Sequence, residues 1–396
     1  MIGFDEALGL VLELALPLGV EKVPLDEAHG RLLSDAVRAR IDAPGADVSA
    51  MDGYAVREAD IQTAPARLRV IGESFPGRGF IGGIGPGQTV RIFTGAPLPE
   101  GAERVVIQEL ASRDGDEVVI PAPPRGGTHI RTRGSDFRAG DWLLDAGRRM
   151  DPAALVVAAG GDVAEVEVFR KPRVAVLGTG DELVEPGTAR STPGAVPESV
   201  TFGVAGMARA WGGEVVSRRR LPDDMAMLEH AARQALKQAE VVVVTGGASV
   251  GEKDFARAMF AEAEPEPMFS KVAIKPGKPA WVSRGRDGRI IVGLPGNPTS
   301  ALVTARLFLA PLLAGLSGDD PMLAHAWREL PLAEPVPETG DRETFLRAAL
   351  GAEGLIPLAS QDSGAQKPLA STEVLIRRAA GAPPAAAGDW VHALGF

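Results

Sequence analysis

The chain has 396 residues, 45% of them hydrophobic, with 48 glycines, 32 prolines, no cysteine and a formal net charge of −10. This length predicts several domains with apolar cores, and the absence of cysteine excludes disulfides, thiolate zinc sites and cysteine nucleophiles. The acidic balance argues against nucleic acid or an anionic membrane as the main partner, so an anionic ligand would need a local cluster of cations.

The N-terminal half predicts one helical segment followed by a small, mostly β module. Residues 1–16 carry apolar side chains at helical spacing, and EKVPL then predicts a strand before the helical DEAHGRLLS. From residue 41 to 139 short β-type runs alternate with Gly and Pro: RLRVIGES, GQTVRIFTG, ERVVIQEL and DEVVIPAP. Residues 140–170 return to a mixed pattern and complete, with residues 1–40, the domain that carries this inserted module.

From residue 171 to 320 strands and helices alternate. The expected strands are RVAVLG, EVVSRRRL, VVVV, MFSKVAI and RIIVGL, and the expected helices cover residues 201–210, 224–238, 253–260 and 298–313. This order predicts a three-layer α/β domain with a doubly wound, mainly parallel sheet. The runs RETFLRAAL, GLIPLA, EVLIRRAA and DWVHALGF predict a C-terminal β domain over residues 328–396. The fold class is therefore multidomain α/β.

No membrane association is expected. The most apolar segment, residues 299–318, contains Arg306 and predicts a buried helix rather than a membrane span. The N-terminal MIGFDEAL has neither a basic n-region nor an apolar h-region, so we expect no secretory signal and a cytoplasmic protein. The five histidines have no metal-ligand spacing, so any metal is expected to be a hard ion held by carboxylates or one brought in with its own ligands.

Two glycine-rich segments follow predicted strands. Gly180 would let the backbone approach a ligand, and Asp181 with Glu182 could hold Mg²⁺, although a glycine turn with solvated acids explains the segment equally well. Residues 245–254 open a helix after VVVV and could cradle an anion. No G-K-[ST] follows, which argues against a standard NTPase. Asp254 could instead face the helix dipole in the first turn.

Two further segments carry cations and a helix start. Lys271, Lys275 and Lys278 lie within eight residues, which suits a phosphate or oxyanion, while a solvated basic turn is the alternative. Asn297 is expected to be the N-cap and Pro298 the first residue of the last helix, with the Ser300 hydroxyl able to face an anion. Asp223-Asp224 is expected to cap a helix.

These strings together resemble the molybdopterin molybdenumtransferase family (MoeA and the gephyrin E domain). The matching segments, in the family's order, are SAMDGYAVR, IFTGAPLPEGAERVV, HIRTRGSDFRAGD, TGDEL, TGGASVGEKDF, KVAIKPGKP and LPGNPTSALV. The resemblance implies an elongated homodimer of four subdomains, in which residues 1–40 and 140–170 form a linker and dimerisation domain and residues 171–320 bind molybdopterin. It further implies an enzyme that inserts molybdate into adenylated molybdopterin with Mg²⁺ and releases AMP. The dithiolene of the substrate would supply the sulfur ligands. A molybdopterin adenylyltransferase and molybdoenzymes are possible partners.

The resemblance also assigns roles to residues. Asp254 would be the main Mg²⁺ ligand, with Asp181, Glu182 and Asp223 assisting. Ser249 and Gly247 would cradle phosphate, and Lys275, Lys278 and Ser300 would meet molybdate or the phosphates. Asp52, Thr94 and Asp136 would reach a site from the partner subunit, and Arg342 and Ser371 would lie on the molybdate side. Further cofactor-binding positions are Gly180, Gly246 and Lys271, and the expected catalytic residues are Asp254, Lys275, Lys278, Asp52 and Thr94.

The chain departs from the family pattern at two places. Where the family reads Y-D-[ST]-N, this chain has Glu198 in place of Asp and Val200 in place of Asn, and the family's S-x-x-L…A-N-G-L-I becomes STEVLI from Ser371. A divergent molybdopterin-binding paralogue that acts as a carrier or scaffold without turnover is therefore the alternative. A third possibility, adenylyl transfer or nucleotide amide hydrolysis, is disfavoured by AMDGYA. Molybdate and tungstate are so similar in size and charge that both remain open as substrates.

Overall fold

The protein, described by a computed structural model over residues 1–246 and 255–396, forms two compact units. The first unit contains Met1–Glu21, Gly30–Ser34 and Val168–Phe396, and the second contains Lys22–His29 and Asp35–Glu167. The paired strands β1 (Val20–Pro24) and β12 (Glu165–Phe169) each carry the chain from one unit into the other.

A six-stranded sheet organises the first unit. Its order is β16 (Glu214–Leu221), β13 (Arg173–Thr179), β17 (Val241–Thr245), β21 (Ile290–Leu294), β20 (Trp281–Arg284) and β18 (Glu266–Phe269). The first four strands are parallel, and β20 and β18 complete the sheet as antiparallel strands. The predicted mainly parallel sheet is confirmed, and the antiparallel strand β20 is an addition that the sequence pattern did not predict.

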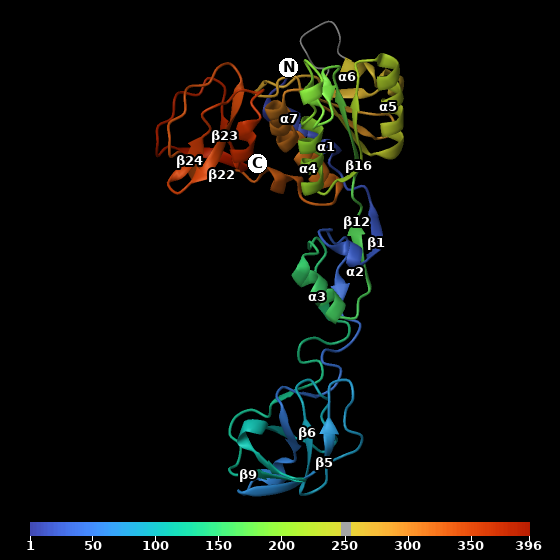
Figure 1. The fold of residues 1–396 in the computed structure, drawn as a ribbon, viewed down its shortest axis with the longest axis vertical. Helices are drawn as coiled ribbons and strands as arrows, with labels where there is room; N and C mark the ends of the chain where they lie inside the picture. The colour runs from blue at the N-terminus through green and yellow to red at the C-terminus, as the bar shows by residue number, and fades with distance from the viewer. Residues whose placement is uncertain (247–254) are drawn as a thin grey trace. The chain divides into compact units, whose positions relative to one another are not determined.

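Side chains of successive residues in the central strands are buried on opposite faces of this sheet. Val174 and Val176 join one core with α1 (Phe4–Leu14), α4 (Val200–Ala210), α7 (Pro298–Thr304) and α8 (Ala310–Leu316). Ala175 and Leu177 join a second core with α5 (Met225–Gln238) and α6 (Phe255–Ala258). Figure 1 shows α4 and α7 on one side of the sheet and α5 on the other. The expected three layers are therefore present.

The last helix of the α/β domain lies in the core. It runs over Pro298–Leu316, with a π-helical segment at Ala305–Leu309 between α7 and α8. The helix is apolar and long enough to span a membrane, but 94% of its most apolar window is buried inside the protein. Arg306 donates to the carbonyls of Gly395 at 2.6 Å and Ala324 at 2.7 Å, and burial lowers the pKa of Arg306 to about 10. The prediction of a buried helix is confirmed.

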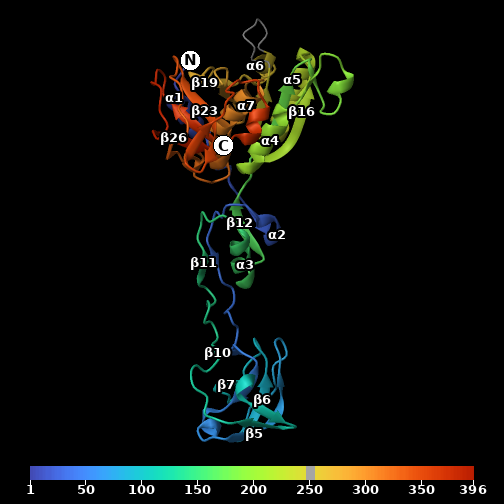
Figure 2. The same cartoon turned by 60° about the vertical axis from the view of Figure 1, so that its left-hand side comes forward.

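The C-terminal sheet lies in the same unit, and one of its strands comes from the sequence of the α/β region. Its order is β19 (Ile274–Lys275), β23 (Glu343–Gly351), β25 (Val374–Arg378), β26 (Trp390–Gly395) and β22 (Arg328–Pro331), with β24 (Gly354–Pro357) paired to β23. Figure 2 shows β19 beside β23, with which it pairs in parallel. The prediction of one strand over MFSKVAI is therefore wrong. The Ile2 N–H donates to the Lys271 carbonyl, and the Ile2 carbonyl accepts from the Ala273 N–H. The chain thus leaves the first sheet after Phe269 and enters the second at Ile274.

The second unit is mostly β, as predicted. Its main sheet has the order β7 (Arg104–Ile107), β4 (Gly53–Val56), β6 (Gln88–Ile92), β5 (Ala66–Ser74), β9 (Glu117–Ile120) and β8 (Ser112–Asp114). Two short ladders pair β2 (Val37–Arg38) with β11 (Trp142–Leu144) and β3 (Val48–Ser49) with β10 (Ile130–Arg131), and α3 covers Pro152–Gly160. The helix predicted over DEAHGRLLS is only the single turn α2 (Leu25–Ala28), because Gly30 takes a φ of +75°.

Candidate functional site

Three turns meet at the carboxyl ends of adjacent parallel strands. Gly178 of β13 is in register with Thr245 of β17, which is in turn in register with Leu294 of β21. The segments that follow, residues 179–182, 245–246 and 295–297, therefore start at one edge of the sheet. In open α/β sheets this edge is where ligands bind.

Glycines allow these turns to touch through their backbones. Gly246 has a φ of +94°, and a Cβ there would lie 2.4 Å from the carbonyl oxygen of Thr179. A Cβ on Gly296 would lie 3.3 Å from the Cα of Gly246. The three turns thus form one continuous backbone surface, in which a side chain at Gly246 has no room.

The acidic residues of the proposed metal site lie at this edge. Asp181 accepts a hydrogen bond from the backbone N–H of Asp223 at 2.9 Å, and the Glu182 carboxylate lies over Gly180, 2.8 Å from the position of a Cβ there. Asp224 caps α5 by accepting from the Met227 N–H, so the capping prediction is confirmed for that residue. Among residues 1–246 and 255–396 no group of three or more acids or histidines is arranged to hold a metal ion. Mg²⁺ commonly binds one or two protein carboxylates together with oxygens of substrate phosphates. Asp181 and its acidic neighbours have carboxylates of the kind required.

Part of the predicted cradle lies outside the described residues. This applies to Gly247, Ser249 and Asp254, and the helix expected from residue 253 is described from Phe255 onward.

The three lysines are exposed around a turn that rests on the core helix. Gly277 has a φ of +107°, and a Cβ there would lie 2.2 Å from the Thr304 side chain. Thr304 in turn donates to the carbonyl of Ser300 at 2.7 Å, so the turn and Ser300 lie on the same side of α7. Within the described part of the chain, Lys271, Lys275 and Lys278 form no ion pair.

Arg342 joins this basic turn. Its Nη1 donates to the carbonyl of Ile274 at 3.2 Å, and Lys275 is in register with Thr344 on β23. The structure therefore brings Lys275 and Arg342, which are far apart in the sequence, to one edge of the C-terminal sheet.

A segment of the C-terminal domain, residues 360–365, covers the first turn of α7; we call it the strap. Asn297 stands at the predicted N-cap, but its Nδ2 donates to Ser363 Oγ at 3.1 Å and does not cap the helix. The Thr299 N–H donates to the Ser363 carbonyl at 3.2 Å, and the Thr299 hydroxyl to the Ala365 carbonyl at 2.8 Å. Ser371 is exposed at the end of a 3-10 turn, Lys367–Ser371.

Arg347 is a buried residue whose side chain hydrogen-bonds to the strap. Its side chain is 1% exposed and donates to the carbonyls of Ser360 at 2.9 Å and Asp362 at 3.2 Å, and to the Thr299 hydroxyl at 3.3 Å. Neither Arg347 nor Ser363 was among the predicted site residues. The available signal was an arginine within the apolar run of β23, because an arginine buried there must be satisfied by several acceptors.

The second unit contains a hydrogen-bonded pair of a carboxylate and a hydroxyl. Asp52 Oδ1 accepts from the N–H of Thr94 at 2.7 Å and from its hydroxyl at 2.8 Å, and these bonds hold the pKa of Asp52 below its ordinary value. Asp136 is exposed, and its backbone N–H donates to the Ala43 carbonyl. The structure thus brings Asp52 and Thr94 together and places Asp136 on a separate loop.

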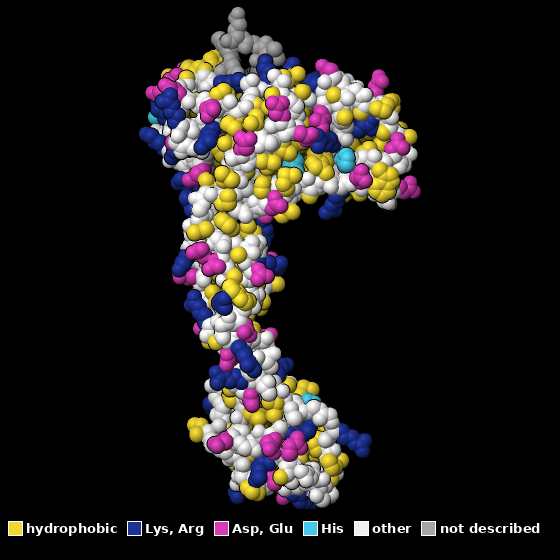
Figure 3. Space-filling view, turned by 180° about the vertical axis from the view of Figure 1, so that it is seen from behind, with side chains coloured by type: hydrophobic (Ala, Val, Ile, Leu, Met, Phe, Trp, Pro, Cys, Tyr) yellow, Lys and Arg dark blue, Asp and Glu magenta, His cyan; other side chains and the backbone are white. Residues whose placement is uncertain are grey.

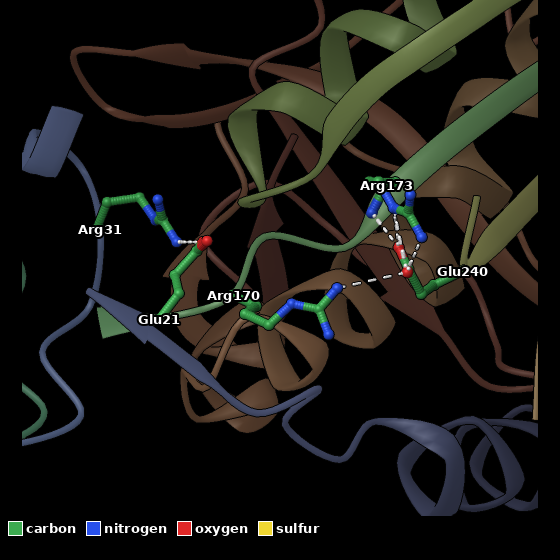
Figure 4. Close-up of polar contacts among 5 residues, drawn as sticks. All are labelled: Glu21, Arg31, Arg170, Arg173 and Glu240. Carbon is green, nitrogen blue, oxygen red and sulfur yellow. Dashed lines mark hydrogen bonds and ion pairs between the residues drawn. The ribbon is translucent and has the colours of Figure 1, made fainter. Parts of the chain in front are cut away.

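Ion pairs lie at the amino-terminal ends of the parallel strands, opposite the candidate site. Glu240 accepts from the Arg173 backbone N–H at 2.8 Å and from its guanidinium at 2.6 Å, with Arg170 at 3.7 Å (Figure 4). Burial raises the pKa of Glu240, but the hydrogen bonds and charge of Arg173 outweigh this effect, so the pKa lies below its usual value. Nearby, Arg31 pairs with Glu21 and donates to the Phe169 carbonyl at 2.7 Å. These contacts fix the amino-terminal ends of the strands and leave the carboxyl edge as the candidate site.

The surface charge is mixed on the face that Figure 3 shows. On the face shown in Figure 3, acidic and basic side chains are interspersed over each unit and do not form one single-sign field. Nucleic-acid-binding proteins usually present a continuous basic patch, which is not seen on this face.

Known proteins match the chain in three consecutive regions. The family models are the MoeA N-terminal region (domain I and II) at residues 2–161, a "probable molybdopterin binding domain" at residues 175–315, and the MoeA C-terminal region (domain IV) at residues 329–396. A molybdopterin molybdenumtransferase of Haemophilus influenzae is 38% identical over 320 residues, covering 80% of this chain and 78% of the relative. One of Synechococcus elongatus is 33% identical and covers 92% of both chains. The chain belongs to the molybdopterin molybdenumtransferase family.

Structural comparison agrees with this assignment. The crystal structure of the MoeA protein of Pyrococcus horikoshii superposes with a TM-score of 0.80 at 29% identity, covering 100% of this chain and 99% of that one. As a member of the molybdopterin molybdenumtransferase family, the protein is an enzyme of the transferase class. The central family region contains the three turns and the lysine turn, and the C-terminal region contains Arg347 and the strap.

Proposed function

We propose that the protein inserts molybdate into adenylated molybdopterin with Mg²⁺-dependent release of AMP. The observation that carries the proposal is the contact of three glycine-containing turns at the carboxyl edge of the parallel sheet, in a chain of this family. In the overall reaction the phosphoanhydride of the substrate is broken by water and AMP leaves. The two dithiolene sulfurs of the substrate replace oxygen ligands of the molybdate.

The chain's own residues bind and orient two anionic substrates. Glycine-containing turns let a phosphate approach the backbone closely, as anion sites at the ends of parallel strands require. Lys275 and Lys278 supply positive charge without a competing carboxylate among the described residues, and Arg342 adds a third cation beside them. Such fixed charges stabilise the charge that develops on oxyanions as the bond breaks.

Asp181, Glu182 and Asp223 are the described residues that would hold Mg²⁺, and Asp254 is a further candidate outside the described range. The bound ion would supply Lewis-acid polarisation of the phosphoanhydride. Asp181 is already oriented by the Asp223 N–H at 2.9 Å. The acidic side chains thus start from a fixed geometry.

We further propose a homodimer in which Asp52, Thr94 and Asp136 complete the site of the partner subunit. The support is the Asp52–Thr94 pair, in which two hydrogen bonds fix the orientation of the carboxylate. Mixing an Asp52→Ala subunit with an Asp181→Asn subunit tests this arrangement. Activity in the mixture, absent from either variant alone, is expected; no recovery on mixing contradicts a shared site.

The function itself is tested with purified protein, adenylated molybdopterin, Mg²⁺ and molybdate. Stoichiometric AMP release with formation of a molybdenum–dithiolene complex is the expected result. Tight binding of adenylated molybdopterin without AMP release would instead indicate a carrier or scaffold and would overturn the proposed reaction.

A further inference from the structure

Glu198 carries a buried carboxylate in the segment where the chain departs from the family pattern. It is 1% exposed, and its Oε1 accepts from the Thr201 N–H at 2.7 Å. Its Oε2 accepts from the Thr201 hydroxyl and from Arg218 Nη1, the latter at 3.2 Å. Because a buried charge is costly unless paired, a carboxylate held in this way fixes its surroundings.

Arg218 brings three elements to the same point. It lies on the edge strand β16, and its Nη1 also donates to the Thr201 hydroxyl at 3.0 Å. Its guanidinium lies 3.7 Å from the ring centre of Phe202 on α4, and its Nη2 is 3.7 Å from Glu185. The pair therefore joins β16, the start of α4 and the loop between β13 and α4.

That loop, residues 183–197, follows directly after the acidic pair Asp181-Glu182. It contains the two-stranded ladder of β14 (Leu183–Val184) and β15 (Val196–Pro197), and we call it the β14–β15 loop. The Val196 N–H donates to the Glu182 carbonyl at 2.8 Å, and the Glu198 N–H to the Val184 carbonyl at 2.8 Å. Arg220 donates to the Leu183 carbonyl at 2.8 Å. The backbone of Glu182 is therefore held by the loop, and the loop is held by β16.

The same carboxylate lies behind the strand that carries the first turn. A Cβ on Gly178 would lie 2.9 Å from Thr201 Cγ2 and 3.7 Å from Glu198 Cγ. Val200, the other departing residue, is 9% exposed and packs in the main core of α4. Both departures thus have structural partners inside the domain: Val200 in the apolar core and Glu198 in the ion pair.

We propose that Glu198 and Arg218 act as a positioning pair that fixes the β14–β15 loop and, through it, the Asp181-Glu182 carboxylates. Neither residue touches substrate; both act through the backbone of Glu182. The consequence for Mg²⁺ affinity rests on the proposed function, whereas the consequence for the order of the loop does not.

The test uses the full-length protein with Glu198→Gln, Arg218→Met, the double variant, and Arg219→Met as the matched control. Arg219 is the exposed neighbour on the same strand. Hydrogen–deuterium exchange of residues 183–197 is expected to rise about ten-fold in both single variants and to stay unchanged in the control. The double variant should resemble the singles, because both remove the same interaction.

The second readout is the Mg²⁺ concentration that half-activates AMP release. It should rise about ten-fold in both single variants, with kcat at saturating Mg²⁺ within about two-fold of wild type, as expected when a metal ligand loses its support. If kcat falls while the Mg²⁺ dependence and the hydrogen–deuterium exchange stay unchanged, the role of the pair is purely structural and the proposal is overturned. Fully additive effects in the double variant would also overturn it. If the wild type releases no AMP, the proposed function fails, and the exchange experiment alone decides the role of the pair.

Discussion

The guanidinium of Arg347 donates to the hydroxyl of Thr299 at 3.3 Å, which joins the C-terminal sheet to the first turn of α7. The same hydroxyl donates to the Ala365 carbonyl in the strap. One buried oxygen therefore takes part in two of the contacts that hold the C-terminal domain against α7, beside the two that Ser363 makes with Asn297 and the Thr299 N–H. Changes at Thr299 should reach bound substrate even though the residue is fully covered.

Replacing Thr299 by valine should raise the KM for adenylated molybdopterin and leave kcat nearly unchanged. Valine keeps the shape but loses both hydrogen bonds, which costs about 2 kcal/mol of unfolding free energy by urea denaturation. Thr299→Ser retains the hydroxyl and is the matched control, expected to stay near wild type in KM. A fall in kcat with constant KM would show that only the folded fraction has changed.

Neutralising the lysine turn should weaken binding of the anionic substrate. Lys275→Met and Lys278→Met are each expected to raise the dissociation constant for adenylated molybdopterin about ten-fold, because a cation is lost beside an oxyanion. The measurement is isothermal titration at two salt concentrations, with a shallower salt dependence in the variants. Lys237→Met, on the exposed face of α5, controls for the change in net charge. Equal affinity in all three variants would remove the lysine turn from the site.

Adding one methyl group at Gly246 should disturb the candidate site. Its φ of +94° is strained for any other residue, and the new Cβ would lie 2.4 Å from the Thr179 carbonyl oxygen. We expect Gly246→Ala to lower the free energy of unfolding by about 2 kcal/mol and to abolish substrate binding. Gly206→Ala, inside α4 with open space around it, should leave substrate binding unchanged and raise the free energy of unfolding by up to about 1 kcal/mol. Substrate binding at wild-type affinity in Gly246→Ala would show that the contact between the turns is dispensable.

Stability should fall at mildly acidic pH because of His325. Its ring is buried, its Nε2 bonds the Leu307 carbonyl at 2.8 Å, and burial lowers the pKa of His325 to about 4. The unfolded chain binds a proton near the ordinary pKa of 6.5, so stability is full above that pH and declines as pH falls toward 4. Unfolding free energies from urea titrations should drop by about 2 kcal/mol between pH 6.5 and 5.

Two histidine variants isolate this effect. His325→Gln should remove this part of the pH dependence, whereas His392→Gln, at an exposed position, should keep it. An unchanged pH profile in His325→Gln would show that other groups cause the decline.

The sequence predicted the parts of the fold that depend on local pattern. The continuous valines of β17 predict a strand buried on both faces, and Asp224 before an amphipathic run predicts a capped helix. Parallel strands also place their carboxyl ends together, so the neighbouring positions of Gly180 and Gly246 follow from the order of elements.

Long-range backbone pairing could not be read from the same pattern. MFSKVAI is apolar enough for one strand, but Ile2 pairs with its middle and divides it between two sheets. Arg347 and Ser363 meet α7 only because β23 and the strap fold back over it, and no spacing within residues 343–365 encodes that contact. Asn297 has the sequence of an N-cap, yet its side chain makes no capping bond and its amide donates to Ser363, a partner 66 residues away in the sequence.

Lys275 forms part of β19 and so belongs by hydrogen bonding to the C-terminal sheet, although it stands in the sequence of the α/β domain. The boundary between the two domains in the sequence therefore differs from the boundary between the two sheets in the fold. A shortened chain ending near residue 326 would keep the whole lysine turn yet lose the strand that aligns it, and a chimera with a foreign C-terminal domain would inherit a differently placed lysine. In this protein the C-terminal domain cannot be exchanged as a module without also changing the site.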